Sequence, residues 1–443
     1  MKSNSNKNSI FSEGDKKYIK KSTFLSIIPG LGQLNNKQFF KGVLFLSIFA
    51  LFVAEMLLFG IPALEGLITL GTDPATDHSL FLLIEGALQI IITIIFLIFL
   101  FANIVDARKV AKMRCINPEN VNYSVKDILN HTLDNGFPYL LTIPAYLLMA
   151  FSIIFPVLVT IFIAFTNYNF RNVPPTNLIE WVGLDTFRNL FVFSAYRDTF
   201  LAVFSWTLIW TFAATTLQLI IGVFTAIVIN QKGLKFKKIF GVIMLLPWAI
   251  PAFITVLTFS NMFNPSVGAI NTQVIPFLDS ILPFVELTSV PWKITTFWTR
   301  IAIIMIQGWV GFPFIYVLTS GVIQSIPDDW YEASVMDGAS AIQKFRFITL
   351  PHIFTVAAPI FVTQYTGNFN NFNTIYLFNE GGPGSIGSGA GSTDILISWI
   401  YKLTTGTSPQ YNVSAAVTLI ISMVVIALSM FIFSKTKAFE MGD

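Results

Sequence analysis

Residues 332–351 read EASVMDGASAIQKFRFITLP and separate two of the long apolar runs of the chain. Glu332 and two small residues open this polar stretch, Gly338 follows after three more positions, and Pro351 closes it. The runs on either side are long enough to cross a bilayer, for which a helix needs about 17–25 apolar residues. The stretch is therefore predicted to be a loop between two membrane helices, and the rest of the chain follows the same alternation.

The composition indicates a polytopic membrane protein. Of the 443 residues, 54% are hydrophobic and only 12% are charged, whereas a soluble chain carries about 25% charged residues. The net charge of +3 is small and spread over several loops, which argues against nucleic-acid binding. The single cysteine, Cys115, excludes an internal disulfide, and three scattered histidines give no metal site. The first twenty residues are polar and lysine-rich, so no cleavable signal peptide is expected.

Hydropathy predicts an all-α fold with about eight transmembrane helices. The expected spans are 42–60, 80–102, 139–166, 200–228, 239–260, 298–320, 353–378 and 413–433. Lysine and arginine gather in the N-terminal segment, in every second loop and in the C-terminal tail, whereas residues 61–79 contain neither. The range 167–199 is an exception, because its three arginines are accompanied by three acidic residues. The positive-inside rule then places both termini and the 332–351 stretch in the cytoplasm.

Loop lengths suggest three parts. Residues 1–41 form a cytoplasmic N-terminal segment, and 42–138 hold an accessory transmembrane hairpin with a cytoplasmic linker. Residues 139–443 form the transport core. The core includes the polar loop, the name used here for residues 325–351.

Within the polar loop, local signals predict two short helices. Ser325 is a candidate cap for a helix that starts near Pro327. This helix should be interrupted near Gly338, and a second piece over 341–348 should end before Pro351. The alternative is an ordinary cytoplasmic loop with a glycine break. The sequence has no GxxxxGK[ST] phosphate loop, so any ATP-driven motion would need an ATPase on another polypeptide.

Amide side chains mark a polar strip in the span 353–378. Gln364, Asn368 and Asn371 share one helical face by their i, i+4, i+7 spacing. Amides beside aromatic rings suit a sugar, whose hydroxyl groups need hydrogen bonds and whose C–H faces need flat apolar contacts. The alternative is hydrogen bonding between helices, which polar membrane residues often provide.

A second candidate strip lies in the span 298–320. It consists of Gln307, Gly311 and Phe314, which share one face. Pro313 is expected to break or kink this helix, and the paired prolines of the span 239–260 should do the same. Broken helices at the midplane often line a permeation path, but packing kinks explain these prolines equally well.

Glu55 and Glu85 are acidic residues inside the first two spans. An intramembrane acid suggests proton coupling by default. No basic residue lies at matching depth, so a structural polar contact or a position near the interface is the favoured interpretation.

Several motifs together resemble one transporter family. SIPDDWYEASVMDGA, ITLP, NFNNFN, FNEGGP and GSTDILISWIYK are similar to segments of MalF-type membrane subunits of maltose and maltodextrin ABC importers. The resemblance implies a type I ABC importer permease fold, in which the polar loop is the EAA loop that inserts into a cleft of the ATPase. The implied ATPase-docking residues are Glu332, Ala333, Ser334, Asp337, Gly338 and Ala339.

The same resemblance implies sugar-contacting positions. They fall on Gln307, Gly311, Phe314, Gln364, Asn368 and Asn371. The surroundings of Gly311, Asn368 and Asn371 match the family best. The other three differ from the family's usual side chains, which puts the preferred sugar in doubt.

The resemblance also implies partners: a MalG-like second permease as heterodimer, two ABC ATPase subunits, an extracellular sugar-binding protein, membrane lipid and the oligosaccharide. ATP and Mg²⁺ would be bound by the ATPase, so the chain should bind no cofactor and be no enzyme. Some relatives carry a folded external domain where this chain has only 167–199, which suggests a Gram-positive bacterial cell membrane. The alternatives are an importer of galacto- or raffinose-type sugars and a stand-alone secondary transporter.

Overall fold

The computed structural model describes residues 11–116, 136–231, 233–281 and 289–436. Most of the predicted linker after the second span, and the ends of both termini, lie outside the described residues. Within them the fold is all-α, with three isolated β-bridges in the loops. The chain divides into two compact units, Met1–Val182 and Gly183–Asp443. The boundary follows the predicted span 139–166, which the sequence analysis grouped with the transport core.

Within the described residues, six helices are long and apolar enough to cross a membrane. They are Phe39–Thr69, Ser79–Ile116, Leu141–Ala164, Ser194–Ile229, Thr296–Gln324 and Ala341–Asn379. A pair bent by 86°, Lys237–Ala249 and Ala252–Met262, makes a seventh span if it is counted as one. The eighth predicted span falls in a shorter apolar helix, Tyr411–Ala427. The prediction of an all-α polytopic membrane protein is confirmed.

The first unit is built from one helical hairpin with additions at both ends. Its elements are α1 (Glu13–Leu25), α2 (Leu31–Asn35), α3 (Phe39–Glu55), the π turn η1 (Met56–Gly60), α4 (Ile61–Thr69), α5 (Ser79–Ile116), α7 (Phe137–Met149), the π turn η3 (Ala150–Ile154) and α8 (Phe155–Ala164). Trp181, which follows α8, joins α8 to the hairpin: its ring meets Phe162 of α8 edge to face at 5.9 Å, and its indole N–H donates to the Leu67 carbonyl oxygen at 2.9 Å. Gln89 of α5 donates to the Glu55 carboxylate at 3.3 Å, which gives this acid the polar contact expected of it, and Glu85 is exposed.

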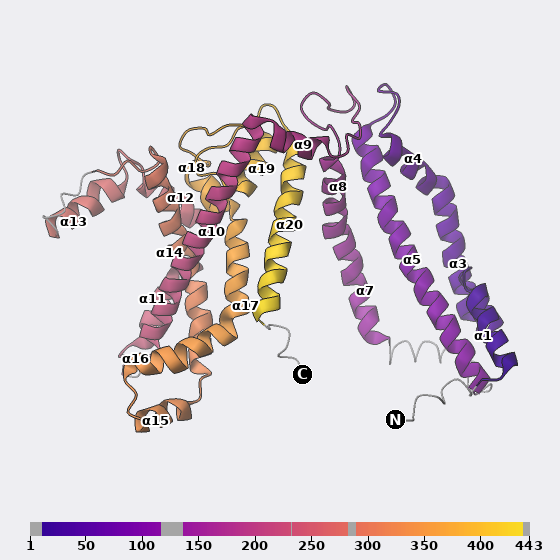
Figure 1. The fold of residues 1–443 in the computed structure, drawn as a ribbon, viewed down its shortest axis with the longest axis horizontal. Coiled ribbons are helices and arrows are strands. Elements are labelled where there is room, and N and C mark those ends of the chain that lie inside the picture. Colours follow the sequence, from indigo (N-terminus) through magenta and orange to yellow (C-terminus); the bar gives the residue numbers. More distant parts are fainter. Residues whose placement is uncertain (1–10, 117–135, 232, 282–288, 437–443) are drawn as a thin grey trace. The chain divides into compact units, whose positions relative to one another are not determined.

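The second unit contains the remaining helices. They are α9 (Asp185–Val192), α10 (Ser194–Ile229), α11 (Lys237–Ala249), α12 (Ala252–Met262), the π turn η4 (Ile270–Val274), α13 (Ile275–Ile281), α14 (Thr296–Gln324), α15 (Asp328–Met336), α16 (Ala341–Lys344), the π turn η5 (Phe345–Thr349), α17 (Leu350–Phe369), α18 (Phe372–Asn379), α19 (Leu396–Thr405) and α20 (Tyr411–Thr436). The helices α10 and α14 run side by side at its centre, with α17 beside them (Figure 1).

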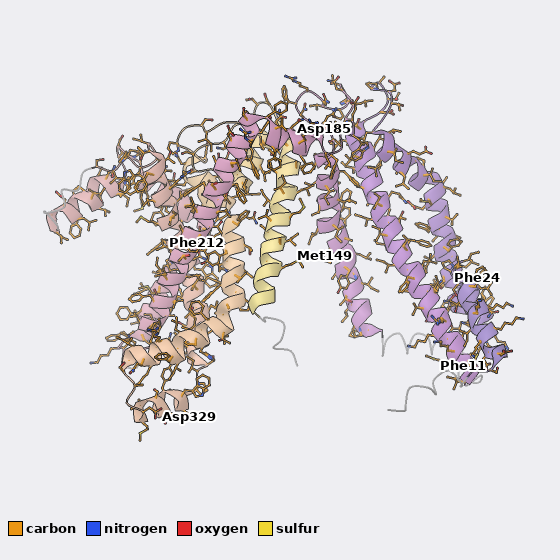
Figure 2. All side chains as sticks on the ribbon, viewed as in Figure 1. Phe11, Phe24, Met149, Asp185, Phe212 and Asp329 are labelled. Atoms are coloured by element: carbon orange, nitrogen blue, oxygen red, sulfur yellow. The ribbon has the colours of Figure 1, made fainter. Side chains whose placement is uncertain are left out.

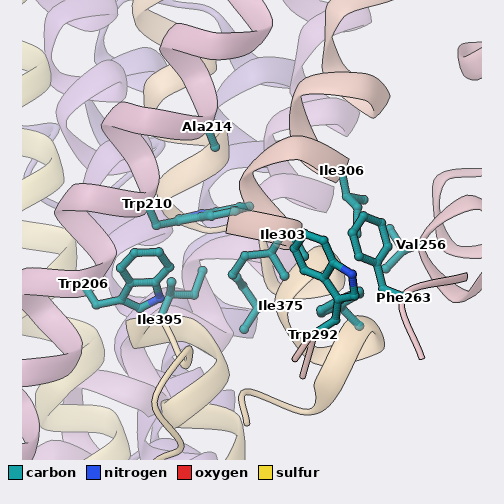
Figure 3. Packing of buried hydrophobic residues seen from close by; sticks show 12 residues of the cluster. Trp206, Trp210, Ala214, Val256, Phe263, Trp292, Ile303, Ile306, Ile375 and Ile395 are labelled. Atoms are coloured by element: carbon teal, nitrogen blue, oxygen red, sulfur yellow. The ribbon is translucent and has the colours of Figure 1, made fainter. Parts of the chain in front are cut away.

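Small residues bring α10 and α14 close together. A Cβ on Gly222 would lie 2.5 Å from the Cβ of Ile315, and one on Gly308 would lie 2.8 Å from Leu217. Such glycines let membrane helices approach until their backbones almost touch. Next to this seam, Trp210 and the other buried side chains of the main core cluster fill the space between α10, α12 and α14 (Figure 3).

Within the described residues, a π turn precedes a proline at four places. Pro62, Pro156, Pro276 and Pro351 each stand two positions after the last residue of a π turn. Proline has no N–H to donate, and its ring clashes with the carbonyl four residues earlier. The wider π turn moves that carbonyl away, so the helix continues through the proline. The prediction that the helix over 341–348 ends before Pro351 is therefore wrong, because it continues into α17.

The other prolines differ in effect. In the span 239–260 the predicted break is confirmed at Pro251: α11 ends at Ala249, and Ile250, which precedes Pro251, is extended. Pro247, the other proline of this pair, lies inside α11 and does not end it. The predicted break at Pro313 is not found, because α14 runs from Thr296 to Gln324. Pro313 is buried against neighbouring helices, whose packing supports the turn that lacks one hydrogen bond.

Candidate functional site

The polar loop holds α15 away from the membrane spans and then returns the chain to α17 (Figure 1). Ser325 does not cap α15 as predicted. Its hydroxyl donates to the Val322 carbonyl oxygen at 2.8 Å and thus ends α14. The N-cap position of α15 is Pro327, and Asp328 and Asp329 follow in the first turn, where negative charge favours the helix dipole.

Gly338 ends α15 in a Schellman motif. Its backbone has a φ of 73°, and its N–H donates to the Val335 carbonyl oxygen at 3.0 Å. The N–H of Ala339 donates to the Ser334 carbonyl oxygen at 2.9 Å, which completes the motif. A Cβ at Gly338 would meet nothing within 4 Å. Glycine is thus favoured here by backbone conformation and not by lack of space.

Aromatic and hydroxyl side chains fasten α15 to the start of α17. The Tyr331 and Thr349 hydroxyl oxygens lie 2.8 Å apart. The rings of Trp330 and His352 meet edge to face, with centroids 5.8 Å apart. Motion of α15 would therefore be passed directly to α17.

Two open grooves flank α15. One, of about 590 Å³, is lined by Ala333, Ser334 and Asp337 together with residues of η5 and α17. The other, of about 280 Å³, is lined by Ser334, Asp337, Gly338 and Ala339. Five of the six predicted docking residues thus line these grooves, and Glu332 is exposed outside both linings.

Apolar side chains around the grooves are exposed. Met336 is 88% exposed, Ile342 78% and Phe347 69%. The sequence analysis did not single out Ile342 or Phe347. Their apolar character beside Lys344 and Arg346 is visible in the sequence, but only the structure shows that both are exposed together with Met336.

Four of the six predicted sugar residues lie at a largely buried junction of α10, α14, α17 and the start of α18. Asn368 is 4% exposed and Gln307 is 7% exposed. The Gln307 side-chain amide donates to the Asn368 carbonyl oxygen Oδ1 at 2.9 Å. Asn368 in turn donates to the Thr215 hydroxyl at 2.9 Å and to Gln218 Oε1 at 3.2 Å.

This hydrogen-bonded group extends in both directions along the helices. Gln218 donates to Gln364 Oε1 at 3.2 Å. The Asn371 amide and the Thr374 hydroxyl both donate to Gln307 Oε1 at 2.8 Å. We call these seven residues the amide network: Thr215, Gln218, Gln307, Gln364, Asn368, Asn371 and Thr374.

The span 353–378 is not one continuous helix as predicted. It breaks after Phe369, and Asn371 caps the next helix by accepting a hydrogen bond from the Thr374 N–H at 3.2 Å. Asn371 therefore does not lie on one helical face with Gln364 and Asn368, as the i, i+7 spacing predicted. Its amide still donates a hydrogen bond to Gln307. An asparagine side chain that competes with the backbone for hydrogen bonds favours such a break.

The remaining two predicted residues have different surroundings. Gly311 packs against the network, because a Cβ there would lie 2.2 Å from Gln218 Oε1. Phe314 packs edge to face with Trp248 at a centroid distance of 6.2 Å. Thr215, Gln218 and Thr374 of the network were not predicted, although Thr215 and Gln218 are polar residues on one face of the apolar span 200–228.

Comparisons with known proteins agree with this architecture. Residues 218–436 match the family described as the binding-protein-dependent transport system inner membrane component. The chain is 59% identical to the maltodextrin transport system permease protein MdxF of Bacillus subtilis, over 96% of this chain and 97% of that protein. It is 47% identical to the galactooligosaccharides transport system permease protein GanP of the same organism, over 94% and 97%.

Among solved structures, a bacterial ABC transporter that imports the acidic polysaccharide alginate superimposes with a TM-score of 0.57. The identity is 20%, and the match covers 71% of this chain and 99% of that one. This likeness shows the ABC importer permease fold. The chain belongs to the family of binding-protein-dependent transport system inner membrane components. It is a multi-pass membrane permease subunit and not an enzyme.

Proposed function

We propose that this permease subunit carries maltodextrin-type oligosaccharides across a bacterial cell membrane. The observation that carries the proposal is the 59% identity to a maltodextrin permease over nearly the whole of both chains. The amide network supports a sugar cargo, because amides offer a donor and an acceptor side by side, as pairs of hydroxyl groups require.

In this proposal the contacts are made by Gln307, Gly311, Phe314, Gln364, Asn368 and Asn371. In the structure these amides bind one another. Sugar binding would therefore exchange protein–protein hydrogen bonds for protein–sugar ones, which leaves no buried polar group unsatisfied in either state. This exchange would make the network a gate as well as a binding site.

We propose that the polar loop docks onto a separate ABC ATPase. The exposed apolar side chains, the two grooves and the rigid Schellman turn at Gly338 support this role. A short helix whose apolar side chains enter a partner's groove is a common recognition mode. ATP and Mg²⁺ would be bound by the ATPase, and α15 would pass the motion to α17 through Tyr331 and Trp330.

The proposed assembly contains this chain, a MalG-like second permease, two ATPase subunits and an external sugar-binding protein. A binding protein is implied by the family description itself. The distribution of lysine and arginine supports cytoplasmic termini. The similarity to Bacillus proteins supports a Gram-positive cell membrane.

A second candidate cargo is a galactooligosaccharide, because the chain is 47% identical to a permease named for that substrate. Uptake of labelled maltotriose and galactotriose decides between them, in a strain that lacks this chain and is complemented with it. Maltotriose uptake alone is expected to depend on the chain. If galactotriose uptake is restored instead, the substrate assignment is wrong while the importer class stands.

A further inference from the structure

A basic groove runs between α1 and the C-terminal end of α5, in the first unit. Its volume is about 990 Å³. The lining residues that matter here are Lys16, Lys20, Phe24, Ile27, Ile104 and Arg108. The groove lies outside the second unit, so neither the polar loop nor the amide network accounts for it.

The groove carries six positive charges. They belong to Lys16, Lys17, Lys20, Lys21, Arg108 and Lys112, all of them exposed. Within the part of the chain that the structure describes, no ion pair joins any of the six to a carboxylate. The nearby Asp106 is already engaged, because Lys41 binds it at 2.8 Å. These charges therefore favour an anion from outside the protein.

Exposed apolar side chains also line this groove. Phe24 is 71% exposed and Ile27 is 54% exposed, and both lie among the lining side chains. Figure 2 labels Phe24 and Phe11 near this end of the first unit. A small soluble anion would neutralise the lysines but leave these side chains in water. A molecule with an anionic head group and apolar chains would both neutralise the lysines and cover the apolar side chains.

Buried hydrogen bonds hold the walls of the groove together. Asn103 of α5 donates to the Ser26 carbonyl oxygen at 2.7 Å, and Asn36 donates to the Ala107 carbonyl oxygen at 2.9 Å. The Ser22 hydroxyl of α1 donates to Asn36 Oδ1 at 2.7 Å. The segment 13–36 is thus fixed to α5, so the groove is already formed before a ligand arrives.

We propose that this groove binds an anionic phospholipid. The phosphate faces the lysines of α1 and Arg108, and the acyl chains cover Phe24 and Ile27. Clusters of four to eight basic residues next to a membrane span attract anionic lipids in this way. The continuity of the groove with α5, a membrane span, places it where a lipid head would lie. The inference does not depend on which sugar the protein carries.

The test uses the purified full-length chain in detergent with spin-labelled phosphatidylglycerol and, for comparison, spin-labelled phosphatidylcholine. We expect phosphatidylglycerol to be retained in preference. The triple variant K16Q/K20Q/R108Q should weaken its binding by about tenfold or more, because each nearby cation adds attraction. The matched control R171Q/R188Q/R197Q removes three exposed cations from a range that also carries three acidic residues, and it should leave binding unchanged.

Two further experiments complete the test. A conservative variant distinguishes a binding defect from a folding defect, and a second variant with a competitor distinguishes a lipid from a free phosphate. The conservative variant K16R/K20R/R108K should bind as the parent does. F24S/I27S keeps every charge and should also weaken phosphatidylglycerol binding, whereas glycerol phosphate should not compete. Equal binding of the two lipids, or K16Q/K20Q/R108Q binding like the parent chain, would overturn the proposal. So would unchanged binding by F24S/I27S.

Discussion

The amide network and the polar loop place side chains in opposite environments: polar groups away from water in the first, and apolar groups in water in the second. In the network, polar groups of α10, α14, α17 and α18 satisfy one another, and Asn368 by itself makes three hydrogen bonds, to Gln307, Thr215 and Gln218. In the polar loop, apolar side chains such as Met336 face water. A satisfied polar group can exist without a ligand, whereas a contiguous patch of exposed apolar side chains often marks a surface that a partner covers.

The difference teaches how strongly each region supports a function. The exposed apolar surface of the polar loop supports the proposed docking role, in addition to the family. The network is complete as it stands, so its sugar role depends on exchanging hydrogen bonds that already exist. Variants that separate backbone conformation, packing and ligand contact therefore test the two regions most sharply.

The largest effect is expected at Gly338. The change Gly338→Glu forces a side chain into a left-handed backbone position and adds charge to the proposed docking groove. We expect ATPase binding to fall by about thirtyfold or more, the size of an interface hot spot, and transport to stop. Co-purification with the ATPase and sugar uptake measure the two effects.

The control is Gly338→Asn, because asparagine tolerates the left-handed conformation. It should keep much of the ATPase binding. If Gly338→Glu retains normal ATPase binding and transport, the polar loop is not the docking site.

For Asn371→Ala we expect sugar uptake to fall about tenfold. The change removes an uncharged hydrogen-bond donor, and such a bond contributes about 1 kcal/mol or slightly more to binding. The ATPase should still co-purify. Asn371 also caps α18, so Asn371→Ser is the matched variant: serine keeps a capping oxygen but lacks the amide. Uptake restored to normal by serine would assign Asn371 to helix capping and remove it from the sugar path.

A smaller effect is expected from Met336→Ser in the polar loop. The side chain is 88% exposed in the chain alone. Burial of such a side chain in a partner contributes about 1.5 kcal/mol, so ATPase affinity should fall roughly tenfold. Met423→Ser, at a methionine of α20 that is 61% exposed, should leave ATPase affinity unchanged. Equal losses in both variants would point to general destabilisation and away from docking.

The smallest effect concerns Gly311 and is one of stability. In Gly311→Ala the new methyl group would meet Gln218 Oε1 and displace it from Asn368. We expect the free energy of unfolding to fall by about 1–3 kcal/mol, as in other overpacked sites. Gly321→Ala in the same helix meets nothing within 4 Å and should be neutral or slightly stabilising. Thermal unfolding of both variants measures the contrast, and equal melting temperatures would contradict it.

Local rules in the sequence predicted much of this fold. Long apolar runs predicted the spans, because the bilayer excludes charge whatever the neighbouring helices are. The glycine break at Gly338 was predicted as well, since the left-handed end of α15 depends on its own few residues. The break before Pro251 followed from the same kind of local constraint.

Other features depended on the neighbours of a residue. Ser325 is a residue type that often caps helices, but it ends α14 instead, because α14 continues to Gln324 and α15 begins only at Asp328. At Pro351 and Pro313 the helix continues, since a π turn in one place and packing in the other compensate for the lost hydrogen bond. The partners Thr215 and Gln218 come from α10, about 150 residues away from Asn368.

The sequence by itself determined that this is an all-α membrane protein, where along the chain its spans and loops fall, and which loop is interrupted by a glycine. These features arise from the bilayer and from local backbone preferences, which are readable over a few residues. Only the tertiary structure decided that amides of α10, α14, α17 and the start of α18 meet in one network and that basic and apolar side chains share a groove beside α5. Both arise from contacts between residues far apart in the chain, and no local pattern specifies which helix faces which.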